Sequence, residues 1–258
     1  MSNINDASWV RDQYASASNL QTRISIHEKY STNPQSFADW LLCQYPLRPG
    51  DRILDVGCGT GSMWRERCLP DGCSLTLADI SPAMVDRARA HLSGAPGVFF
   101  ACADIQALPY PDGCFDVVVA NMMLYHVPDI ARALAEVRRV LRPGGCFCCS
   151  TFGENGIARF VDEVMAGIGS RMTQANTFTL QNGEAWLRTC FAKVARRDYA
   201  DELRVTDARD MLDYIRSMQG ISMTRAASDT ELLSRLAARS SGGVIRVPKE
   251  YGCFIART

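Results

Sequence analysis

The stretch Ile53-Leu-Asp-Val-Gly-Cys-Gly-Thr-Gly61 decides the fold, because it joins a short apolar strand to three closely spaced glycines. Glycines at a strand end let the backbone turn sharply and approach a ligand. A dinucleotide-binding loop needs the pattern G-x-G-x-x-G, but Ser62 stands at its third glycine position. A phosphate-binding P-loop needs Gly-Lys-Ser/Thr, which is absent. The loop therefore predicts a ligand at a strand end and disfavours a pyrophosphate.

Strand and helix signals alternate from residue 50 to residue 152. The strands are apolar throughout, which indicates burial on both faces of a sheet. The interleaved helices indicate that this sheet is parallel and doubly wound. We predict strands over 52–56, 74–78, 98–102 and 115–120, helices over 61–68, 81–93 and 129–141, and a Cys-rich strand over 145–152.

An acidic residue follows the second predicted strand. Asp79 ends that strand, one helix and one strand beyond Gly57. In α/β nucleotide-binding folds, a carboxylate at this place accepts hydrogen bonds from ribose hydroxyls. The ligand is therefore expected to contain a ribose, without necessarily containing a phosphate.

The composition excludes several classes of protein. The 258 residues include 28 basic and 28 acidic side chains, so the formal net charge is zero. A neutral chain argues against nucleic acid or an anionic membrane as the main partner. No run of 18 apolar residues is present, and the first 30 residues lack the apolar run of a signal peptide. We expect a soluble, cytoplasmic protein.

The eleven cysteines predict neither a disulfide framework nor a metal site. Their number is odd and their spacing is not that of a small secreted domain. Cys146 and Cys149 form one CxxC pattern, but on a strand these two side chains point to opposite faces. No second CxxC or histidine pair accompanies them, so we expect no metal ligands.

Four motifs, in order and at ordinary spacing, resemble those of the class I S-adenosylmethionine-dependent methyltransferases. The resemblance is to the small-molecule, type 11 group that includes ubiquinone and menaquinone methyltransferases, and it extends from residue 51 to residue 145. Each motif is weak alone, whereas all four together are specific. They are Leu54-Asp-Val-Gly-Cys-Gly-Thr-Gly61, Asp79-Ile-Ser-Pro-Ala-Met84, Ala103-Asp-Ile-Gln-Ala-Leu-Pro-Tyr-Pro-Asp112 and Leu141-Arg-Pro-Gly-Gly145.

This resemblance implies an enzyme that uses S-adenosyl-L-methionine and moves a methyl group to a small-molecule acceptor by in-line displacement, in biosynthesis. The expected fold is a Rossmann-like, doubly wound, mostly parallel seven-stranded sheet with an antiparallel last strand. We expect four parts: an N-terminal helical lid over 1–46, the cofactor-binding core over 47–152, a helical cap insertion over 153–182, and the C-terminal part of the α/β core over 183–258.

The resemblance also places individual cofactor contacts. Gly57 and Gly59 would let the backbone approach the methionyl part, and the N-terminus of the following helix would favour its carboxylate. Asp55 would lie near the methionyl ammonium group. Asp79 would hold the ribose, with Ile80 against the adenine.

The third and fourth strands would complete the cofactor site. Asp104 would accept a hydrogen bond from the adenine amino group, and Ile105 would supply a backbone contact. Asn121 would offer its carbonyl near the sulfonium. Arg23, on the N-terminal lid, is also expected to contact the cofactor, because its guanidinium group could close over a charged ligand.

Methyl transfer from a sulfonium mainly requires alignment and exclusion of water, and a general base only if the acceptor must lose a proton. The catalytic candidates are His126 and Tyr125, after the fourth strand, and Tyr14 on the lid. His126 is the best base candidate, although a packing role fits its position equally well. His27 and Tyr30 are further acceptor-side candidates.

Other reactions remain open. The cofactor's own amino group could attack its γ-carbon, giving azetidine-2-carboxylate and methylthioadenosine, and the core motifs do not distinguish this cyclisation from methyl transfer. An NAD enzyme, a non-catalytic binding protein and a thiol-based arsenic methyltransferase are lower alternatives. The sequence does not specify the acceptor, the atom methylated, the use of a base or the oligomeric state.

Overall fold

The computed structural model describes residues 17–168, 178–218 and 227–258. The chain divides into two compact units, and each is described by itself. Unit 1 consists of Met1–Ser36, Phe152–Asn176 and Asp198–Tyr251, and unit 2 of Phe37–Thr151, Thr177–Arg197 and Gly252–Thr258. The four-part division at residues 46, 152 and 182 remains a prediction.

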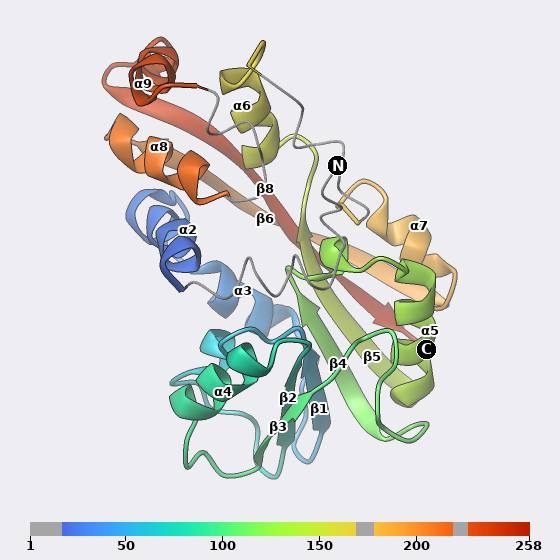
Figure 1. Cartoon of the computed structure of the whole chain (residues 1–258). Helices are drawn as coiled ribbons and strands as arrows, with labels where there is room; N and C mark the ends of the chain where they lie inside the picture. The colour runs from blue at the N-terminus through green and yellow to red at the C-terminus, as the bar shows by residue number, and fades with distance from the viewer. Residues whose placement is uncertain (1–16, 169–177, 219–226) are drawn as a thin grey trace. The chain divides into compact units, whose positions relative to one another are not determined.

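The strands pair in the order β3-β2-β1-β4-β5-β8-β6, with β7 beside β8 (Figure 1). Strands β1 to β5 are parallel, whereas the last strands are antiparallel. The predicted Rossmann-like, mostly parallel sheet is therefore confirmed. The strands are β1 (Arg52–Val56), β2 (Ser74–Asp79), β3 (Val98–Cys102), β4 (Phe115–Asn121), β5 (Leu141–Phe152), β6 (Lys193–Val205), β7 (Ser240–Ser241) and β8 (Val244–Arg257).

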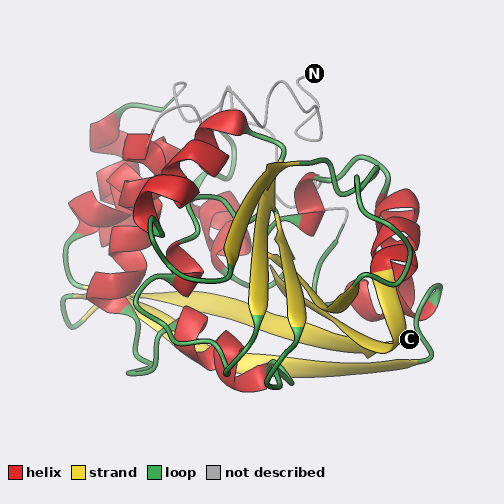
Figure 2. Ribbon diagram, turned by 90° about the horizontal axis from the view of Figure 1, so that it is seen from below, coloured by secondary structure: helices red, strands yellow, loops and turns green. Residues whose placement is uncertain are grey.

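Helices are interspersed among the strands along the chain, and Figure 2 shows the helices in red and the strands in yellow. Local signals set their ends: the Asp129 carboxylate accepts a hydrogen bond from the Arg132 backbone N–H, and Pro82 occupies the first turn of its helix. In the described ranges, no helix combines the length and the apolar character that crossing a membrane requires. The helices are α2 (Ala17–Tyr30), α3 (Phe37–Gln44), α4 (Pro82–His91), α5 (Ile130–Val140), α6 (Ile157–Val164), α7 (Gly183–Arg188), α8 (Ala208–Ser217) and α9 (Asp229–Ala237).

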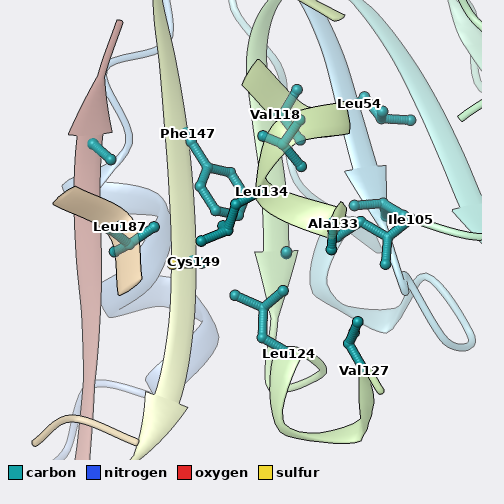
Figure 3. Close-up of a cluster of buried hydrophobic side chains, with 14 of the residues drawn as sticks. Leu54, Ile105, Val118, Leu124, Val127, Ala133, Leu134, Phe147, Cys149 and Leu187 are labelled. Carbon is teal, nitrogen blue, oxygen red and sulfur yellow. The ribbon is translucent and has the colours of Figure 1, made fainter. Parts of the chain in front are cut away.

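In unit 2, alternate residues of the central strands contribute to two separate apolar clusters. Val118 and Phe147 pack in a cluster that α5 and α7 complete, and Leu134 of α5 and Leu187 of α7 are among the side chains drawn there (Figure 3). Val117 and its neighbours of the same parity join the second cluster, with residues of α3 and α4. Helices therefore cover both faces, which is the doubly wound arrangement.

The helix predicted over 61–68 is wrong. Only the short 3-10 turn η1 (Ser62–Trp64) forms, because Arg65 is extended and Glu66 is left-handed, with a φ of 59°. The Arg67 guanidinium donates a hydrogen bond of 2.7 Å to the Met63 carbonyl, which satisfies a group that a continuing helix would have paired.

The prediction that every strand is buried on both faces is also wrong for β3. This strand is at the edge of the sheet, next to β2 alone, and the Phe99 side chain is 58% exposed. An apolar sequence is therefore compatible with an edge position, because composition reports the average burial of a strand and not its neighbours.

Unit 1 has its own apolar core, formed by α2, α6, α8 and α9 with the unit 1 parts of β6 and β8. A buried ion pair joins the two strands. Lys249 Nζ lies 2.6 Å from Asp201 Oδ2, and these side chains are 3% and 0% exposed. Asp201 also accepts hydrogen bonds from the backbone N–H groups of Thr32 and Asn33, at 2.9 and 3.0 Å, which ties the segment after α2 to β6.

We predict that Lys249→Met lowers the free energy of unfolding by about 3–5 kcal/mol, because it leaves the Asp201 carboxylate buried without its counter-charge. Adding Asp201→Asn should recover part of the loss, since the double variant holds no buried charge. Urea unfolding followed by circular dichroism measures both.

The matched control is the exposed pair of Arg246 and Glu202, which joins the same two strands at 2.7 Å. Arg246→Met should cost less than about 1 kcal/mol. A double variant at Lys249 and Asp201 that is less stable than Lys249→Met alone would show that the loss does not come from the unpaired charge.

Candidate functional site

Unit 2 brings the predicted cofactor residues to one edge of its sheet. Strand β1 pairs in parallel with β2 on one side and β4 on the other, so the carboxyl ends of all three lie together. Between β1 and β4 the chain order of the strands reverses, and ligands of open α/β sheets bind at such a point. Asp55, Asp79 and Asn121 lie at or next to these strand ends.

The glycine loop begins at the end of β1. The backbone N–H groups of Gly57 and Cys58 donate to the Ala78 carbonyl at 2.8 and 3.0 Å, which ties the loop to β2. Gly57 has a φ of 72°, and a Cβ atom there would lie 2.8 Å from Met123 Cγ. Only glycine meets both conditions, so this loop approaches the segment after β4 closely.

Asp79 connects the loop to the start of α4. Its Oδ2 accepts from the Gly59 N–H and its Oδ1 from the Ser81 N–H, both at 2.9 Å. Burial raises the pKa of this carboxyl, and the two backbone bonds oppose the shift. The carboxylate is thereby held beside the glycine loop, and each of its oxygens keeps a further lone pair for a ligand hydroxyl.

Asp55 is a buried carboxylate with an incomplete set of partners. Its Oδ2 accepts a hydrogen bond of 2.6 Å from Trp64 Nε1, whereas its Oδ1 is buried and has no partner among the described residues. Burial raises the pKa of Asp55 to about 7, the Trp64 bond opposes this shift, and the Asp79 charge adds to it. A buried acceptor of this kind favours a cationic donor, which none of the described residues supplies.

Asn121, at the end of β4, is held by three side chains. Its Oδ1 accepts from Tyr45 Oη at 2.6 Å and from Ser150 Oγ at 2.9 Å. Its Nδ2 lies 2.9 Å from Met63 Sδ. Both ends of the amide group are therefore held by neighbouring side chains.

Four further residues of this edge lie outside the predicted set of site residues: Tyr45, Met63, Trp64 and Ser150. Tyr45 belongs to the segment after α3, and its hydroxyl reaches a residue 76 positions away. Trp64 and Met63 lie in a segment that was predicted to be an ordinary helix. A buried tryptophan needs a partner for its N–H, and that was the one available signal.

The adenine-side candidates lie in the loop after β3 and after β2. Asp104 Oδ1 accepts from the Gln106 backbone N–H at 2.9 Å, Ile105 is buried in the apolar core, and Ile80 is half-buried. The structure therefore places Ile80 after β2, which neighbours β1, and Asp104 and Ile105 after β3, the next strand beyond β2. Their contacts with adenine remain predictions.

Tyr125 and His126 follow β4 in a second 3-10 turn, η2 (Leu124–His126). Both are half-buried, and their ring centroids are 4.5 Å apart. Unit 2 therefore holds these two catalytic candidates together with the cofactor candidates. Their catalytic roles remain predictions.

The lid candidates belong to unit 1, apart from Tyr14, which lies outside the described residues. Arg23 is on α2, and its cofactor contact remains a prediction. His27 lies between the Tyr214 and Tyr251 rings, and burial together with the nearby Lys249 charge lowers its pKa to about 3. The imidazole is therefore neutral at physiological pH. Tyr30 donates a hydrogen bond to Asp210 and ties α2 to α8.

The cysteines of the described ranges are free thiols. Burial raises the pKa of Cys58, in the glycine loop, well above its usual range, so this thiol stays protonated. None of the eleven cysteines, all of which lie in the described ranges, forms a disulfide. Within those ranges no three His, Cys, Asp or Glu side chains are grouped to hold a metal ion.

These groups fit the sulfonium cofactor that the sequence predicts, with one correction. The orphaned Asp55 oxygen suits an ammonium group, and the Asp79 carboxylate suits ribose hydroxyls. The predicted helix N-terminus beside the cofactor carboxylate is wrong, because η1 has only three residues and sums too few peptide dipoles.

Comparison with known proteins gives one family model and several relatives. The model described as "Methyltransferase domain" matches residues 54–149. A malonyl-(acyl-carrier protein) O-methyltransferase of Serratia marcescens is 33% identical over 192 residues, which cover 72% of this chain and 70% of that enzyme. The 27-O-demethylrifamycin SV methyltransferase of Amycolatopsis mediterranei is 41% identical over 44% of this chain and 43% of its own length.

The fold also resembles solved structures. The crystal structure of the cyclase SpnF superposes with a TM-score of 0.60 at 20% identity, covering 98% of this chain and 96% of that one. At this identity the similarity concerns the fold alone.

We predict that Asp55→Asn stabilises the ligand-free protein by about 2 kcal/mol at about pH 8, and by less at about pH 5. Burial raises the folded-state pKa of Asp55 from its ordinary value of 3.8 to about 7, so between these pH values the folded chain retains a proton that the unfolded chain has lost. The stability contributed by this carboxyl therefore falls as the pH rises through that window. Asparagine removes the charge and still accepts the Trp64 bond.

The matched control is Asp116→Asn, on β4, because that buried carboxylate lies 2.6 Å from the Arg142 guanidinium. This variant should lose stability at about pH 8, since it removes a paired charge. Chemical unfolding at both pH values tests the prediction, and a destabilised Asp55→Asn at the higher pH would contradict it.

Proposed function

The chain belongs to the class I S-adenosylmethionine-dependent methyltransferases, and we propose that it methylates a small-molecule acceptor at the carboxyl-end edge of unit 2. The observation that supports this site most directly is the buried Asp55 carboxylate, which has one oxygen without a partner beside the glycine loop. A carboxylate in this state is matched by an ammonium group, which the methyl donor carries.

Different residues of unit 2 are proposed to bind different parts of S-adenosylmethionine. Asp55 accepts from the ammonium group, the backbone at Gly57 and Gly59 admits the methionyl part, and Asp79 accepts from the ribose. Asp79 is already held by two backbone N–H groups, so its orientation costs little ordering entropy on binding. Ile80, Asp104 and Ile105 are proposed to surround the adenine.

When bound, S-adenosylmethionine would supply a methyl group on a positively charged sulfur. The acceptor would bond to the methyl carbon in line with the carbon–sulfur bond, and the sulfur would leave as S-adenosylhomocysteine. The chain then has to hold the acceptor in line and exclude water. Asn121, fixed by Tyr45 and Ser150, gives this part of the site a rigid wall. His126 is proposed to accept a proton where the acceptor must lose one, with Tyr125 beside it.

The segments outside the family model are proposed to select the acceptor, with Tyr14 as a catalytic candidate and Arg23 as a cofactor-binding candidate. The family model covers only residues within unit 2, whereas two relatives act, by name, on a malonyl-(acyl-carrier protein) and on 27-O-demethylrifamycin SV. Different acceptors on a shared core indicate that recognition comes from the parts that vary. We further propose a cytoplasmic enzyme of small-molecule biosynthesis.

We predict that incubation with S-adenosylmethionine alone releases no nucleoside, and that S-adenosylhomocysteine forms only when an accepted small molecule is added. Chromatography with mass spectrometry identifies the product. Methylthioadenosine formed without an acceptor would instead establish cyclisation. S-adenosylhomocysteine should raise the melting temperature and NAD should not, because only a ligand of the folded state stabilises it.

We predict that Asp79→Ala weakens the binding of S-adenosylhomocysteine by roughly 10- to 100-fold, since a hydrogen bond to a charged group contributes about 1.5–3 kcal/mol. Isothermal calorimetry measures the affinity. The control is Asp86→Ala, an exposed carboxylate on α4 that is paired with Arg89, which should bind as the wild type does. Unchanged affinity in Asp79→Ala would contradict the ribose role.

A further inference from the structure

The turn η1 stands where a helix was predicted, and it delivers one large side chain to the base of the site. Trp64 is 3% exposed and packs in the apolar cluster that also contains Leu41, Ile53 and Leu75. Gly61 begins this turn in the left-handed conformation, with a φ of 69°. The indole is therefore fixed by packing and does not depend on a ligand for its position.

The indole N–H donates to a carboxylate that belongs to the predicted site. Trp64 Nε1 donates to Asp55 Oδ2 at 2.6 Å, which is short for an N–H···O bond. Apolar packing alone would not need this bond, because phenylalanine fills a similar space without a donor. The bond leaves Oδ1 as the carboxylate oxygen that is buried without a partner among the described residues.

The other ionisable groups that influence Asp55 are not cations. Asp79 at the end of β2 adds a negative charge, and the neighbouring Cys58 thiol and Tyr45 hydroxyl are each neutral or negative. Among the groups acting on this carboxylate, Trp64 is therefore the one that favours its ionised form.

We propose that Trp64 is a positioning residue for the methyl donor: it binds one oxygen of Asp55, fixes the plane of the carboxylate and presents the second oxygen to the donor's ammonium group. This proposal rests on the proposed function. Removing the indole N–H leaves both Asp55 oxygens without a partner from the described chain. The carboxyl then retains its proton to a higher pH, and a protonated carboxyl is a poor acceptor for an ammonium group.

The first test uses the wild-type protein without ligand. Nuclear magnetic resonance of the isotope-labelled indole N–H groups should show one signal, absent in Trp64→Phe, that shifts with pH as Asp55 titrates. In Asp55→Asn that signal should no longer respond to pH. A Trp64 signal that is independent of pH in the wild type would overturn the proposal, and this outcome leaves the methyltransferase assignment intact.

The second test measures S-adenosylhomocysteine binding by calorimetry between about pH 6 and pH 8.5. Trp64→Phe should bind about tenfold more weakly near neutral pH and recover affinity toward the alkaline end, because the carboxyl ionises there without help. The control is Trp40→Phe, whose indole packs against the same apolar cluster and stacks on Phe37. It should follow the wild-type pH profile.

Two results separate the proposal from a purely structural role. An affinity loss in Trp64→Phe that is equal at every pH would indicate lost packing and overturn the positioning role. Wild-type protein that binds no S-adenosylhomocysteine at any pH would overturn the proposed function, and the ligand-free titration of the Trp64 signal would still decide the contact with Asp55. Circular dichroism confirms that each variant is folded.

Discussion

The parallel pairing of β1 with β2 on one side and β4 on the other is the constraint on which the site depends. This pairing places the carboxyl ends of three strands at one edge, so residues far apart in the chain become neighbours. The glycine loop then needs to turn only once to lie beside Asp79, and the Gly59 N–H donates a hydrogen bond to that carboxylate. A one-residue slip of β1 would turn Asp55 to the opposite face.

Two buried carboxylates show how the same fold treats charge in opposite ways. Asp201 in unit 1 is fully paired, with Lys249 on one oxygen and backbone N–H groups on the other. Asp55 in unit 2 has an indole on one oxygen and no partner from the described chain on the other. A buried carboxylate with its counter-charge joins the elements around it, whereas a buried carboxylate oxygen without a partner favours the binding of a ligand that donates to it. This difference distinguishes the site from a structural cluster of similar composition.

The neighbourhood of the proposed methyl donor is rigid on the protein's side. Asn121 is held at both ends of its amide, and Met122, which follows it, has a φ of 50° that non-glycine residues rarely adopt. Such a conformation persists only where the surrounding packing imposes it. A reaction whose electrophile arrives already activated benefits from this rigidity, because alignment is the main contribution left to the protein.

The amino-acid sequence determined the strands, the glycine loop and the acidic residues at the strand ends. These features are local, since periodicity, the Asp129 cap and Pro82 act within a few residues, and the topology of parallel strands then places Asp55, Asp79 and Asn121 together. The amino-acid sequence did not determine the edge position of β3, because the composition of a strand does not specify which strands pair with it.

The tertiary structure alone decided which side chains complete the site. Tyr45 reaches Asn121 across 76 positions, and Trp64 reaches Asp55 only because the expected helix stops after one turn. Neither contact is marked in the sequence by a periodic pattern or a motif. Each depends on the burial of both side chains, to which many segments contribute. Local sequence therefore specifies the edge of the sheet at which the site lies. Packing specifies which donors form hydrogen bonds with the Asp55 carboxylate and the Asn121 amide.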